Sequence, residues 1–335
     1  MIVLVTGASG FLGGRIAQLL AKRGVEVRAL VRHGRDMPHL TGTQVQIQSG
    51  DLSDPNSLSR AVIGVSHVIH CAACSTDWAP WPVFFESNVT GVENLVRAAA
   101  RQPRLERFLH VSTTDVYGYP ESPCDESHPL TDVALPYNRS KCMGEQLIWD
   151  GAKEFGLPLT VVRPATIFGP RGKAFVIDIA RLIRQQTMAV IDGGRVPGGF
   201  CYVDNAANGI IQAATHPSTE GQAYNLTDGT GVTWRRYVDT LADALGERRP
   251  WINLPSKVAF ATARAFETAH RFLRLSGNPL LTRHAVFLLS RNQEYPIQKA
   301  QRDFEFSPEI SFEEGMARSA AWLQLANRSS AGTLD

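Results

Sequence analysis

The chain of 335 residues is 44% hydrophobic and 20% charged, which argues against a disordered chain and provides enough apolar residues for a packed core. Its 34 Lys and Arg residues against 32 Asp and Glu residues give a formal charge of +2, so the overall balance predicts no nucleic-acid partner. The sequence has five cysteines, no run of 18 apolar residues and no secretory signal at its start, so we expect a cytoplasmic protein without a disulfide framework or a membrane span.

In the first half of the chain, short runs rich in Val, Ile and Leu alternate with longer amphipathic stretches. The runs predict buried strands at Ile2–Val5, Val25–Val31, Val45–Gln48, Val68–Cys71, Phe108–Val111 and Leu159–Val162. The stretches between them predict helices at Phe11–Lys22, Pro55–Val62, Val83–Ala100 and Asn138–Phe155. This alternation predicts a doubly wound α/β fold, in which a mostly parallel sheet is covered by helices on both faces.

From residue 166 onward this alternation weakens. The remaining helices are predicted at Asn205–Thr215, Trp234–Leu245, Ser256–Leu275 and Phe312–Leu325, without regular strand partners. We therefore expect a smaller C-terminal α/β substrate lobe over residues 166–326 that is interleaved with the sheet. Small polar residues over 327–335 predict a disordered tail.

A glycine-rich segment, Thr6–Gly13, follows the first predicted strand and opens the first predicted helix. Gly7, Gly10 and Gly13 have the spacing G-x-x-G-x-x-G. Glycine permits a tight turn and a close approach of the backbone to a pyrophosphate, and the helix N-terminus supplies donors and a dipole for the anion. In this strand–turn–helix context the segment predicts a dinucleotide site and makes residues 1–165 a Rossmann domain.

The end of the second predicted strand indicates which dinucleotide binds. An NAD site places a carboxylate there for the ribose 2′-hydroxyl, whereas an NADP site places an Arg for the 2′-phosphate. This chain has Arg32 at that place and no acid before Asp36. The sequence therefore favours NADP(H), with NAD(H) as second choice and a solvated surface role for Arg32 as the alternative. Asp51, followed by Leu52, is a candidate to meet the adenine or to cap the helix that begins near Pro55.

Tyr137 and Lys141 lie four residues apart in a predicted helix, so both side chains project from one face. Ser112 and Thr113 end a buried strand, where hydroxyl groups face a bound ligand. A free phenol has a pKa of roughly 10, and an adjacent ammonium favours its phenolate. These groups suit acid–base chemistry at a carbonyl.

Together these segments resemble the extended short-chain dehydrogenase/reductase family of NAD(P)-dependent epimerases, dehydratases and dehydrogenases. The resemblance spans about residues 1–325 and is carried by Thr6–Gly13, Gly50–Leu52, Asn88–Gly91, Val111–Thr113, Val116–Gly118, Tyr137–Lys141 and Arg163–Pro164. It implies that Tyr137 is the acid/base, that Lys141 lowers the pKa of Tyr137, that Thr113 bonds the reacting oxygen and that Asn88 lies near the active site. The implied cofactor-binding residues are Gly7, Ser9, Gly10, Phe11, Leu12, Gly13, Arg32, Asp51, Leu52, Cys71, Ala72, Ala73, Ser112, Tyr137, Lys141 and Pro164, the last against the nicotinamide.

Two positions bear on whether the substrate is a nucleotide sugar. Dehydratases that resemble this chain carry an Asp-Glu pair where it has Thr114 and Asp115, which argues against dehydration and leaves a decarboxylase, acting through Asp115, as a minor alternative. Many nucleotide-sugar enzymes place an Arg-Asp pair where this chain has Gly198 and Gly199. A diphosphate would lack its expected cation there.

Aromatic residues favour an apolar substrate. Trp78 and Trp81, with Leu254–Pro255 and Pro279–Arg283, resemble the branch of 3β-hydroxysteroid dehydrogenases, sterol dehydrogenases and 2-alkyl-3-ketoalkanoate reductases. Trp78 and Trp81 are therefore expected to line the substrate site, together with Thr113 and Asp115. Core or dimer packing is the alternative for the neighbouring aromatic residues.

The predicted helix Ser256–Leu275 mixes apolar and basic residues. From Glu247 to Arg291 there are eight Lys or Arg and two Glu residues, so the local charge is 8 − 2 = +6. A helix that covers the substrate site is the favoured interpretation. A peripheral contact with an anionic membrane surface is the alternative.

Cys71 and Cys74 have the spacing of half a metal or redox site. The other three cysteines are scattered and form no second pair at metal-ligand spacing. We therefore predict no metal.

The sequence predicts an NADP-dependent oxidoreductase that interconverts a ketone and a secondary alcohol on a largely apolar small molecule. A nucleotide-sugar epimerase or decarboxylase that recycles bound NAD is the main alternative, and a non-catalytic NADP(H) sensor is a third. The resemblance also implies a homodimer, formed by the helices Val83–Ala100 and Asn138–Phe155 as a four-helix bundle.

Overall fold

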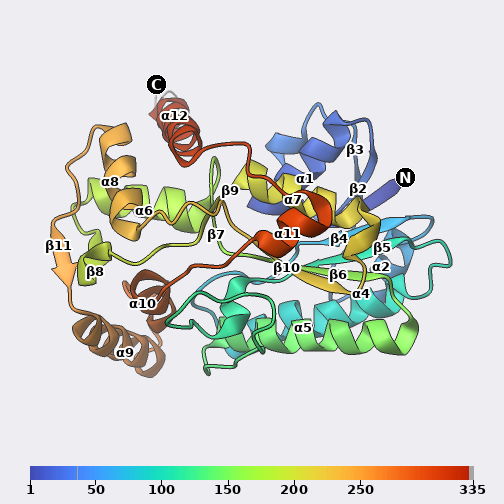
Figure 1. Ribbon diagram of the computed structural model, residues 1–335, viewed down its shortest axis with the longest axis horizontal. Coiled ribbons are helices and arrows are strands. Elements are labelled where there is room, and N and C mark those ends of the chain that lie inside the picture. The colour runs from blue at the N-terminus through green and yellow to red at the C-terminus, as the bar shows by residue number, and fades with distance from the viewer. Residues whose placement is uncertain (36, 332–335) are drawn as a thin grey trace.

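The computed structural model describes residues 1–35 and 37–331. Within this range seven parallel strands form the main sheet, in the order β10-β6-β5-β4-β1-β2-β3 (Figure 1). The strands are β1 (Ile2–Thr6), β2 (Glu26–Val31), β3 (Val45–Ser49), β4 (His67–His70), β5 (Arg107–Val111), β6 (Leu159–Pro164) and β10 (Gln222–Leu226). This confirms the doubly wound α/β fold. The strand order reverses between β1 and β4, and ligands of such sheets bind at the carboxyl ends of the strands at that place.

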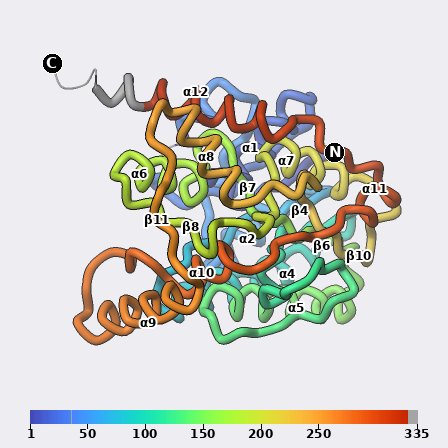
Figure 2. The backbone as a smooth tube through the Cα atoms, turned by 60° about the vertical axis from the view of Figure 1, so that its left-hand side comes forward, coloured from blue at the N-terminus to red at the C-terminus, as the bar shows by residue number. Residues whose placement is uncertain are grey.

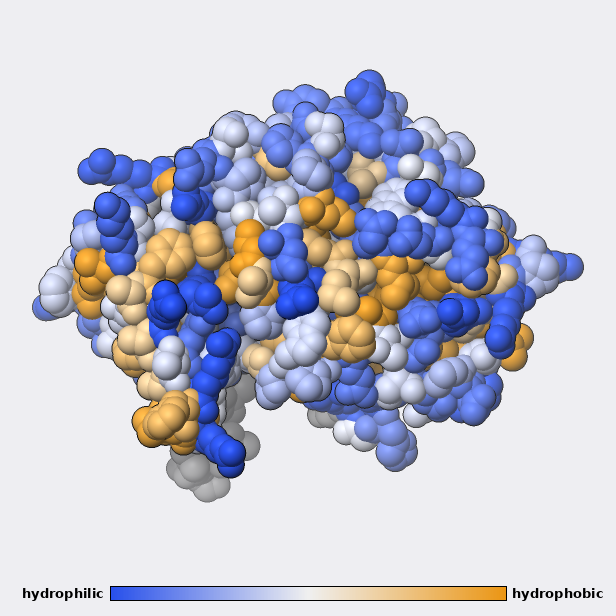
Figure 3. Space-filling model, turned by 90° about the horizontal axis from the view of Figure 1, so that it is seen from below, coloured by the Kyte–Doolittle hydropathy of each residue, from blue (hydrophilic) through white to orange (hydrophobic). Residues whose placement is uncertain are grey.

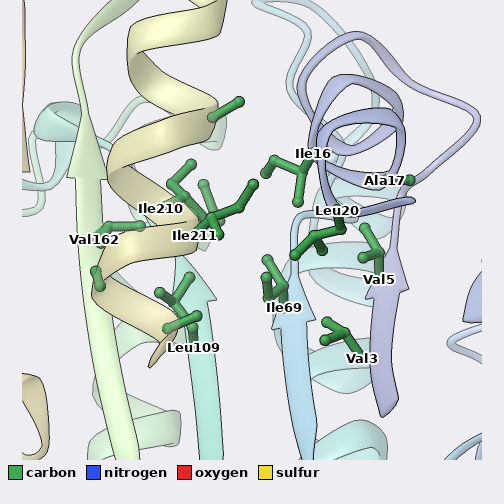
Figure 4. Close-up of a cluster of buried hydrophobic side chains, with 14 of the residues drawn as sticks. Val3, Val5, Ile16, Ala17, Leu20, Ile69, Leu109, Val162, Ile210 and Ile211 are labelled. Atoms are coloured by element: carbon green, nitrogen blue, oxygen red, sulfur yellow. The ribbon is translucent and has the colours of Figure 1, made fainter. Parts of the chain in front are cut away.

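Helices cover both faces of the sheet. One face is covered by α1 (Phe11–Lys22) and α7 (Val203–Thr215). The opposite face is covered by α2 (Pro55–Ala61), α4 (Gly91–Ala99) and α5 (Pro136–Phe155). Figure 4 shows part of the first layer, where Ile16 and Leu20 of α1 and Ile210 of α7 point toward the strands. These side chains are buried, which anchors the helix that follows the glycine turn.

The stretch predicted as one helix over Val83–Ala100 is divided into three segments. They are α3 (Trp81–Phe85), the π-helical η2 (Glu86–Thr90) and α4. A Cβ on Gly144 of α5 would lie 2.2 Å from the carbonyl oxygen of Asn88, so the close packing of α5 on η2 requires glycine. The π-helical segment thus places Asn88 directly against α5, and such segments are frequent at functional sites.

The C-terminal lobe contains two small parallel pairs of strands within the described residues. They pair β7 (Thr166–Phe168) with β9 (Phe200–Tyr202) and β8 (Ala189–Ile191) with β11 (Ile252–Leu254). The helices of the lobe are η4 (Lys173–Asp178, π-helical), α6 (Ile179–Arg184), α8 (Trp234–Leu245), α9 (Ser256–Phe272), α10 (Arg283–Ser290), α11 (Gln298–Phe304) and α12 (Phe312–Ala331). Short 3-10 turns are η1 (Pro38–Leu40), η3 (Thr114–Tyr117), η5 (Asp192–Gly194) and η6 (Pro217–Thr219). The tube in Figure 2 shows that the chain returns from this lobe to the main sheet and leaves it again.

Some element bounds in the C-terminal half of the chain differ from the predicted ones. Helix α12 extends to Ala331, and the disordered tail predicted over residues 327–335 stays a prediction. Residues 332–335 lie outside the described residues. The helix predicted over Ser256–Leu275 ends at Phe272, and α10, α11 and β10 were not predicted.

Helices α4 and α5 lie side by side, and Met143 and Phe155 of α5 are partly exposed on their outer face. The homodimer through these helices stays a prediction. No helix of the described residues is long and apolar enough to cross a membrane.

A buried ion pair joins α5 to the main sheet. The Glu145 carboxylate accepts hydrogen bonds from Arg163 Nη2 at 2.5 Å and from Arg163 Nε at 3.1 Å, and both residues are buried. Arg163 also donates to the Tyr117 hydroxyl at 2.8 Å, which in turn donates to Asn225 on β10 at 2.7 Å. The pair thus ties α5, β6, η3 and β10 together beneath the site.

We expect Glu145→Ala to lower the free energy of unfolding by about 3–5 kcal/mol, because it leaves the Arg163 guanidinium buried and unpaired. Urea denaturation measures the difference. The double variant Glu145→Ala/Arg163→Met, which removes both charges, should be less destabilised than Glu145→Ala alone. A loss below 1 kcal/mol for Glu145→Ala, on the scale of exposed pairs, would contradict this role.

Candidate active site

The glycine turn between β1 and α1 is as tight as its sequence predicts. Gly7 has φ +70°, and a Cβ there would lie 2.8 Å from the Ala72 amide nitrogen. A Cβ on Gly13 would lie 2.5 Å from the Gly7 carbonyl oxygen. Side chains at these two positions would therefore push the turn away from the neighbouring strand end and from its own helix.

The N-terminus of α1 is free to hold an anion. No side chain of the described residues caps it, and its first turn has no acidic residue. The backbone donors of Phe11, Leu12 and Gly13 therefore lack the partner that a capping side chain would supply. This is the arrangement in which a helix N-terminus binds a pyrophosphate.

Two residues at this turn were missed by the sequence analysis. Arg171 donates to the Gly10 carbonyl at 3.3 Å, and the His39 ring lies 3.0 Å from the Ala8 carbonyl oxygen. Arg171 comes from the loop between β7 and η4, more than 150 residues from the glycines. No spacing in the sequence links Arg171 to the glycine turn.

At the adenosine side of the predicted site, Arg32 is exposed directly after β2. Hydrogen bonds from the Ser53 amide and hydroxyl, with the positive charge of Arg32, hold the pKa of Asp51 below its usual value. Asp54 caps α2 by accepting from the Asn56 amide, so the interpretation of Asp51 as that cap is wrong. Arg32 and Asp51 thus lie close together on neighbouring strand ends.

The strand ends also bring the other predicted cofactor residues together. The Ala72 amide donates to the Thr6 hydroxyl at 3.1 Å, which joins the segment Cys71–Ala73 to β1. Ser112 is buried, and its hydroxyl has no hydrogen-bond partner in the described part of the chain. Such an orphaned hydroxyl at the carboxyl edge of the sheet, on the same edge as the glycine turn, fits a dinucleotide. Pro164 ends β6 at the same edge of the sheet.

Lys141 lies one turn after Tyr137 on α5 and is buried. Its ammonium donates to the Val111 carbonyl at 3.0 Å. Burial lowers the pKa of Lys141 to about 8, against the opposing charge of Glu145. Behind it lies the buried His70, whose pKa is lowered to about 3 by burial and by the charge of Lys141. His70 is therefore neutral near pH 7, and the neighbouring Lys141 carries the positive charge of the two.

The Tyr137 phenol lies on the first turn of α5. Burial raises the pKa of its phenol, the negative charge of Asp115 raises it further, and a hydrogen bond with the Thr113 hydroxyl lowers it. The phenol is therefore protonated in this state. The roles predicted for Thr113 at the reacting oxygen and for Tyr137 as acid/base stay predictions.

Asn88 positions other parts of the site. Its amide oxygen accepts from the Cys74 amide at 2.8 Å, and its amide nitrogen donates to the Cys74 carbonyl at 3.0 Å and to the Ser140 hydroxyl at 2.9 Å. Both ends of the side chain are used within the protein. Asn88 therefore fastens the loop after β4 to α5, next to Lys141.

A buried acid–base pair lies beside Tyr137. His284 Nε2 lies 2.7 Å from Asp115 Oδ2, and the Tyr119 hydroxyl donates to the same oxygen at 2.9 Å. The rings of His284 and Tyr137 are 5.4 Å apart. Burial alone would lower the pKa of His284, but the hydrogen bond and the charge of Asp115 outweigh burial and raise it. The sequence analysis missed His284, which begins α10 far along the chain.

A series of aromatic side chains leads from the Asp115–His284 pair into the C-terminal lobe. Tyr119 stacks on Phe287 at 5.0 Å between ring centroids, and Phe287 contacts Phe260 at 4.8 Å. Trp78, predicted to line the substrate site, lies under the Arg271 guanidinium of α9 at 5.3 Å. Trp81 is more exposed, with the Arg139 guanidinium 5.3 Å from its ring.

Phe84, for which core packing was the alternative, is buried 6.4 Å from the Tyr137 ring. It therefore closes the side of Tyr137 that faces α3. The two tryptophans predicted to line the substrate site thus have different surroundings. Trp78 lies under α9, whereas Trp81 lies at the start of α3.

Cys71 and Cys74 are free thiols. Burial raises the pKa of Cys71 to about 12, which disfavours the thiolate that metal binding and disulfide exchange need. Among the described residues, no three His, Cys, Asp or Glu side chains are grouped to hold a metal ion.

Comparison with known proteins agrees with this geometry. A family model described as the NAD dependent epimerase/dehydratase family matches residues 3–227. The chain is 33% identical to the 4-hydroxy-2-methyl-3-oxo-4-farnesyl-3,4-dihydroquinoline-1-oxide ketoreductase of Stigmatella aurantiaca, over 94% of this chain and 95% of the relative. It is 32% identical to the 2-alkyl-3-oxoalkanoate reductase of Stenotrophomonas maltophilia, over 95% of this chain and 98% of the relative.

Among solved structures, the crystal structure of gox2253 aligns with a TM-score of 0.82 and 26% identity, covering 98% of this chain and 99% of that one. The family match spans more than half of the chain and includes the glycine turn, Thr113, Tyr137 and Lys141. The relatives extend the similarity over the C-terminal lobe. The chain therefore belongs to the NAD dependent epimerase/dehydratase family, the extended short-chain dehydrogenases/reductases, and is an NAD(P)-dependent enzyme of that family.

Proposed function

We propose that the chain is an NADP(H)-dependent ketoreductase that interconverts a ketone and a secondary alcohol on a largely apolar 3-oxo compound. The observation that carries the proposal is the placement of Tyr137 and the buried Lys141 one turn apart on α5, with aromatic side chains and His284 beside Tyr137 on the side of the C-terminal lobe. The similarity to a ketoreductase and to a 2-alkyl-3-oxoalkanoate reductase supports the same reaction.

Each of the site residues has a separate role in carbonyl reduction. A nicotinamide dinucleotide held at the glycine turn would supply the hydride for the carbonyl carbon. The Tyr137 hydroxyl donates its proton to the carbonyl oxygen as negative charge develops there, while the Thr113 hydroxyl holds that oxygen. The Lys141 ammonium stabilises the phenolate that remains on Tyr137. In the direction of alcohol oxidation the same phenolate accepts the proton.

Two features weigh against the nucleotide-sugar alternative. The Asp115 carboxylate accepts hydrogen bonds from Tyr119 and His284, so it is not a free base for decarboxylation or dehydration. The Arg of the nucleotide-sugar enzymes would stand at Gly198, where a Cβ would lie 2.3 Å from the Phe200 ring, so a larger side chain would clash where a diphosphate would need a cation. A substrate without a diphosphate fits these residues better.

The preference for NADP(H) rests on cations. Arg32 is exposed at the end of β2, and Arg171 lies at the glycine turn. A 2′-phosphate carries more charge than a ribose hydroxyl, so an Arg at the end of β2 favours NADP(H).

Tyr137→Phe removes the proton donor and leaves the ring in place. We expect kcat/KM for ketone reduction to fall by about 10²–10⁴-fold, while NADPH affinity, measured by fluorescence titration, changes little. Tyr224→Phe is the matched control, because Tyr224 lies on β10 and its hydroxyl bonds Asp303. Full activity in Tyr137→Phe would show that Tyr137 is not the proton donor.

Arg32→Ala is expected to weaken NADPH binding by about tenfold or more while NADH binding changes little, since a charged hydrogen bond contributes roughly 1.5–3 kcal/mol. Titration of both dinucleotides gives the ratio. Arg28→Ala on the same strand is the control, because its guanidinium donates to the Ala61 and Ile63 carbonyls. An unchanged ratio of NADPH to NADH affinity in Arg32→Ala would contradict the assignment of Arg32 to the 2′-phosphate.

The Asp115–His284 pair makes stability depend on pH. Because the pKa of His284 is raised in the folded protein, its contribution is complete below the unfolded value, roughly 6.5, and is lost as pH rises through the folded pKa. The wild type should therefore exceed His284→Gln in free energy of unfolding by more at pH 5.5 than at pH 9, by about 1.4 kcal/mol for each pH unit of the shift.

Urea denaturation at both pH values measures this difference. The control is His33→Gln, which alters an exposed loop residue. A gap between wild type and His284→Gln that is the same at both pH values would show that His284 carries no added proton.

A further inference from the structure

Helix α9 lies at one end of the molecule with one face turned outward (Figures 1 and 2). Its inner face packs Ala259 and Ala263 against Ile191 and Val286. Buried Glu267 fixes the helix by accepting hydrogen bonds from the Arg283 amide and guanidinium, both at 2.8 Å. The helix is therefore held firmly by its inner face, and the outer face needs no further contact for folding.

The outer face is apolar. Large side chains are exposed on it and on the connection to α10, with Phe272 at 85%, Leu273 at 62% and Leu280 at 84% of full exposure. Val258, Phe266 and Leu275 are also exposed. A shallow groove along the same face is lined by Ala261, Arg264, Ala265, Thr268, Ala269, Phe272 and Leu273. An exposed apolar patch of this kind marks an interaction surface.

The charges around this face have one sign. Lys257, Arg264, Arg271 and Arg274 are exposed on α9 and just after it. The sequence from residue 256 to residue 282 has one acidic residue, Glu267, and that residue is buried with Arg283. In Figure 3, which views the molecule from below, apolar and hydrophilic side chains alternate at the end where α9 lies.

We propose that the outer face of α9 and the connection to α10 dock on the surface of an anionic lipid bilayer. The apolar side chains would enter the boundary between headgroups and acyl chains, and the basic side chains would meet lipid phosphates. A protein partner with its own mixed charges would place acids and bases opposite this surface, whereas an anionic bilayer matches a surface with cations alone. The contact is peripheral, since none of the described helices could span a bilayer.

The docking surface continues into the active site. Arg271 and His270 of α9 contact Trp78, and Phe260 of α9 begins the series of rings that leads through Phe287 to Tyr119. A lipid-soluble ketone that leaves the bilayer at α9 would therefore meet apolar side chains on its way to Tyr137. This last step rests on the proposed function, whereas the docking itself does not.

Vesicle flotation tests the proposal with the full chain. The wild type should float with phosphatidylcholine vesicles that contain phosphatidylglycerol at low salt, and should not float with phosphatidylcholine alone. Phe272→Ser/Leu273→Ser and Lys257→Gln/Arg264→Gln/Arg274→Gln should each reduce the bound fraction by about tenfold or more, through the apolar and the electrostatic contribution respectively. High salt should release the wild type.

The matched control is Ile63→Ser/Arg101→Gln/Arg104→Gln, which removes an exposed apolar side chain and two exposed charges at the far end of the sheet. Circular dichroism and NADPH titration confirm that each variant is folded. Flotation of both α9 variants like the wild type, or no flotation of the wild type, would overturn the proposal. So would light scattering that shows a dimer lost in the α9 variants without vesicle binding, because the face would then join two copies of the chain. Reduction of a water-soluble 3-oxo ester, measured without vesicles, tests the proposed function separately.

Discussion

Two opposite charges buried one turn apart on α5 govern the rest of the active site. Lys141 is surrounded by protein and has the Val111 carbonyl as a hydrogen-bond acceptor, while Glu145 is paired with Arg163. Glu145 also raises the pKa of Lys141 against the effect of burial. Without that carboxylate, the lysine would lose its proton more readily and would no longer stabilise a phenolate. The carboxylate that holds α5 on the sheet therefore also favours the charged form of Lys141.

On the cofactor side of the site, close packing between backbone segments is as important as the buried charges are on α5. Gly7, Gly13 and Gly144 leave room for main chain where a methyl group would clash, at Ala72, at Gly7 and at Asn88 respectively. These contacts bring the glycine turn, the loop after β4 and α5 to a common edge of the sheet. The hydroxyls of Ser112 and Thr113 end the strand that faces this edge. The chemistry of the site therefore depends on backbone packing as much as on the reactive side chains.

The sequence predicted those parts of the site that lie in local patterns. Strand–turn–helix context located the glycines, and helical spacing placed Tyr137 and Lys141 on one face of α5. It did not reveal Arg171 or His284, because each reaches the site from a distant segment without a spacing that identifies it. Nor did periodicity show that the predicted helix over Val83–Ala100 contains a π-helical turn, since a segment of five residues is too short to establish a period of its own. Long-range contacts had to come from the structure.

His284 shows what the C-terminal lobe adds to the Rossmann domain. Asp115 belongs to η3 of the Rossmann domain, whereas His284 begins α10, and the bond between them links the lobe directly to the Tyr137 environment. An unpaired Asp115 would raise the pKa of Tyr137 further through its negative charge, so the lobe affects proton transfer as well as substrate contact. The same α10 is fixed to α9 by Glu267 and Arg283. Helix α9 is therefore connected through Arg283 to the histidine that lies beside Tyr137.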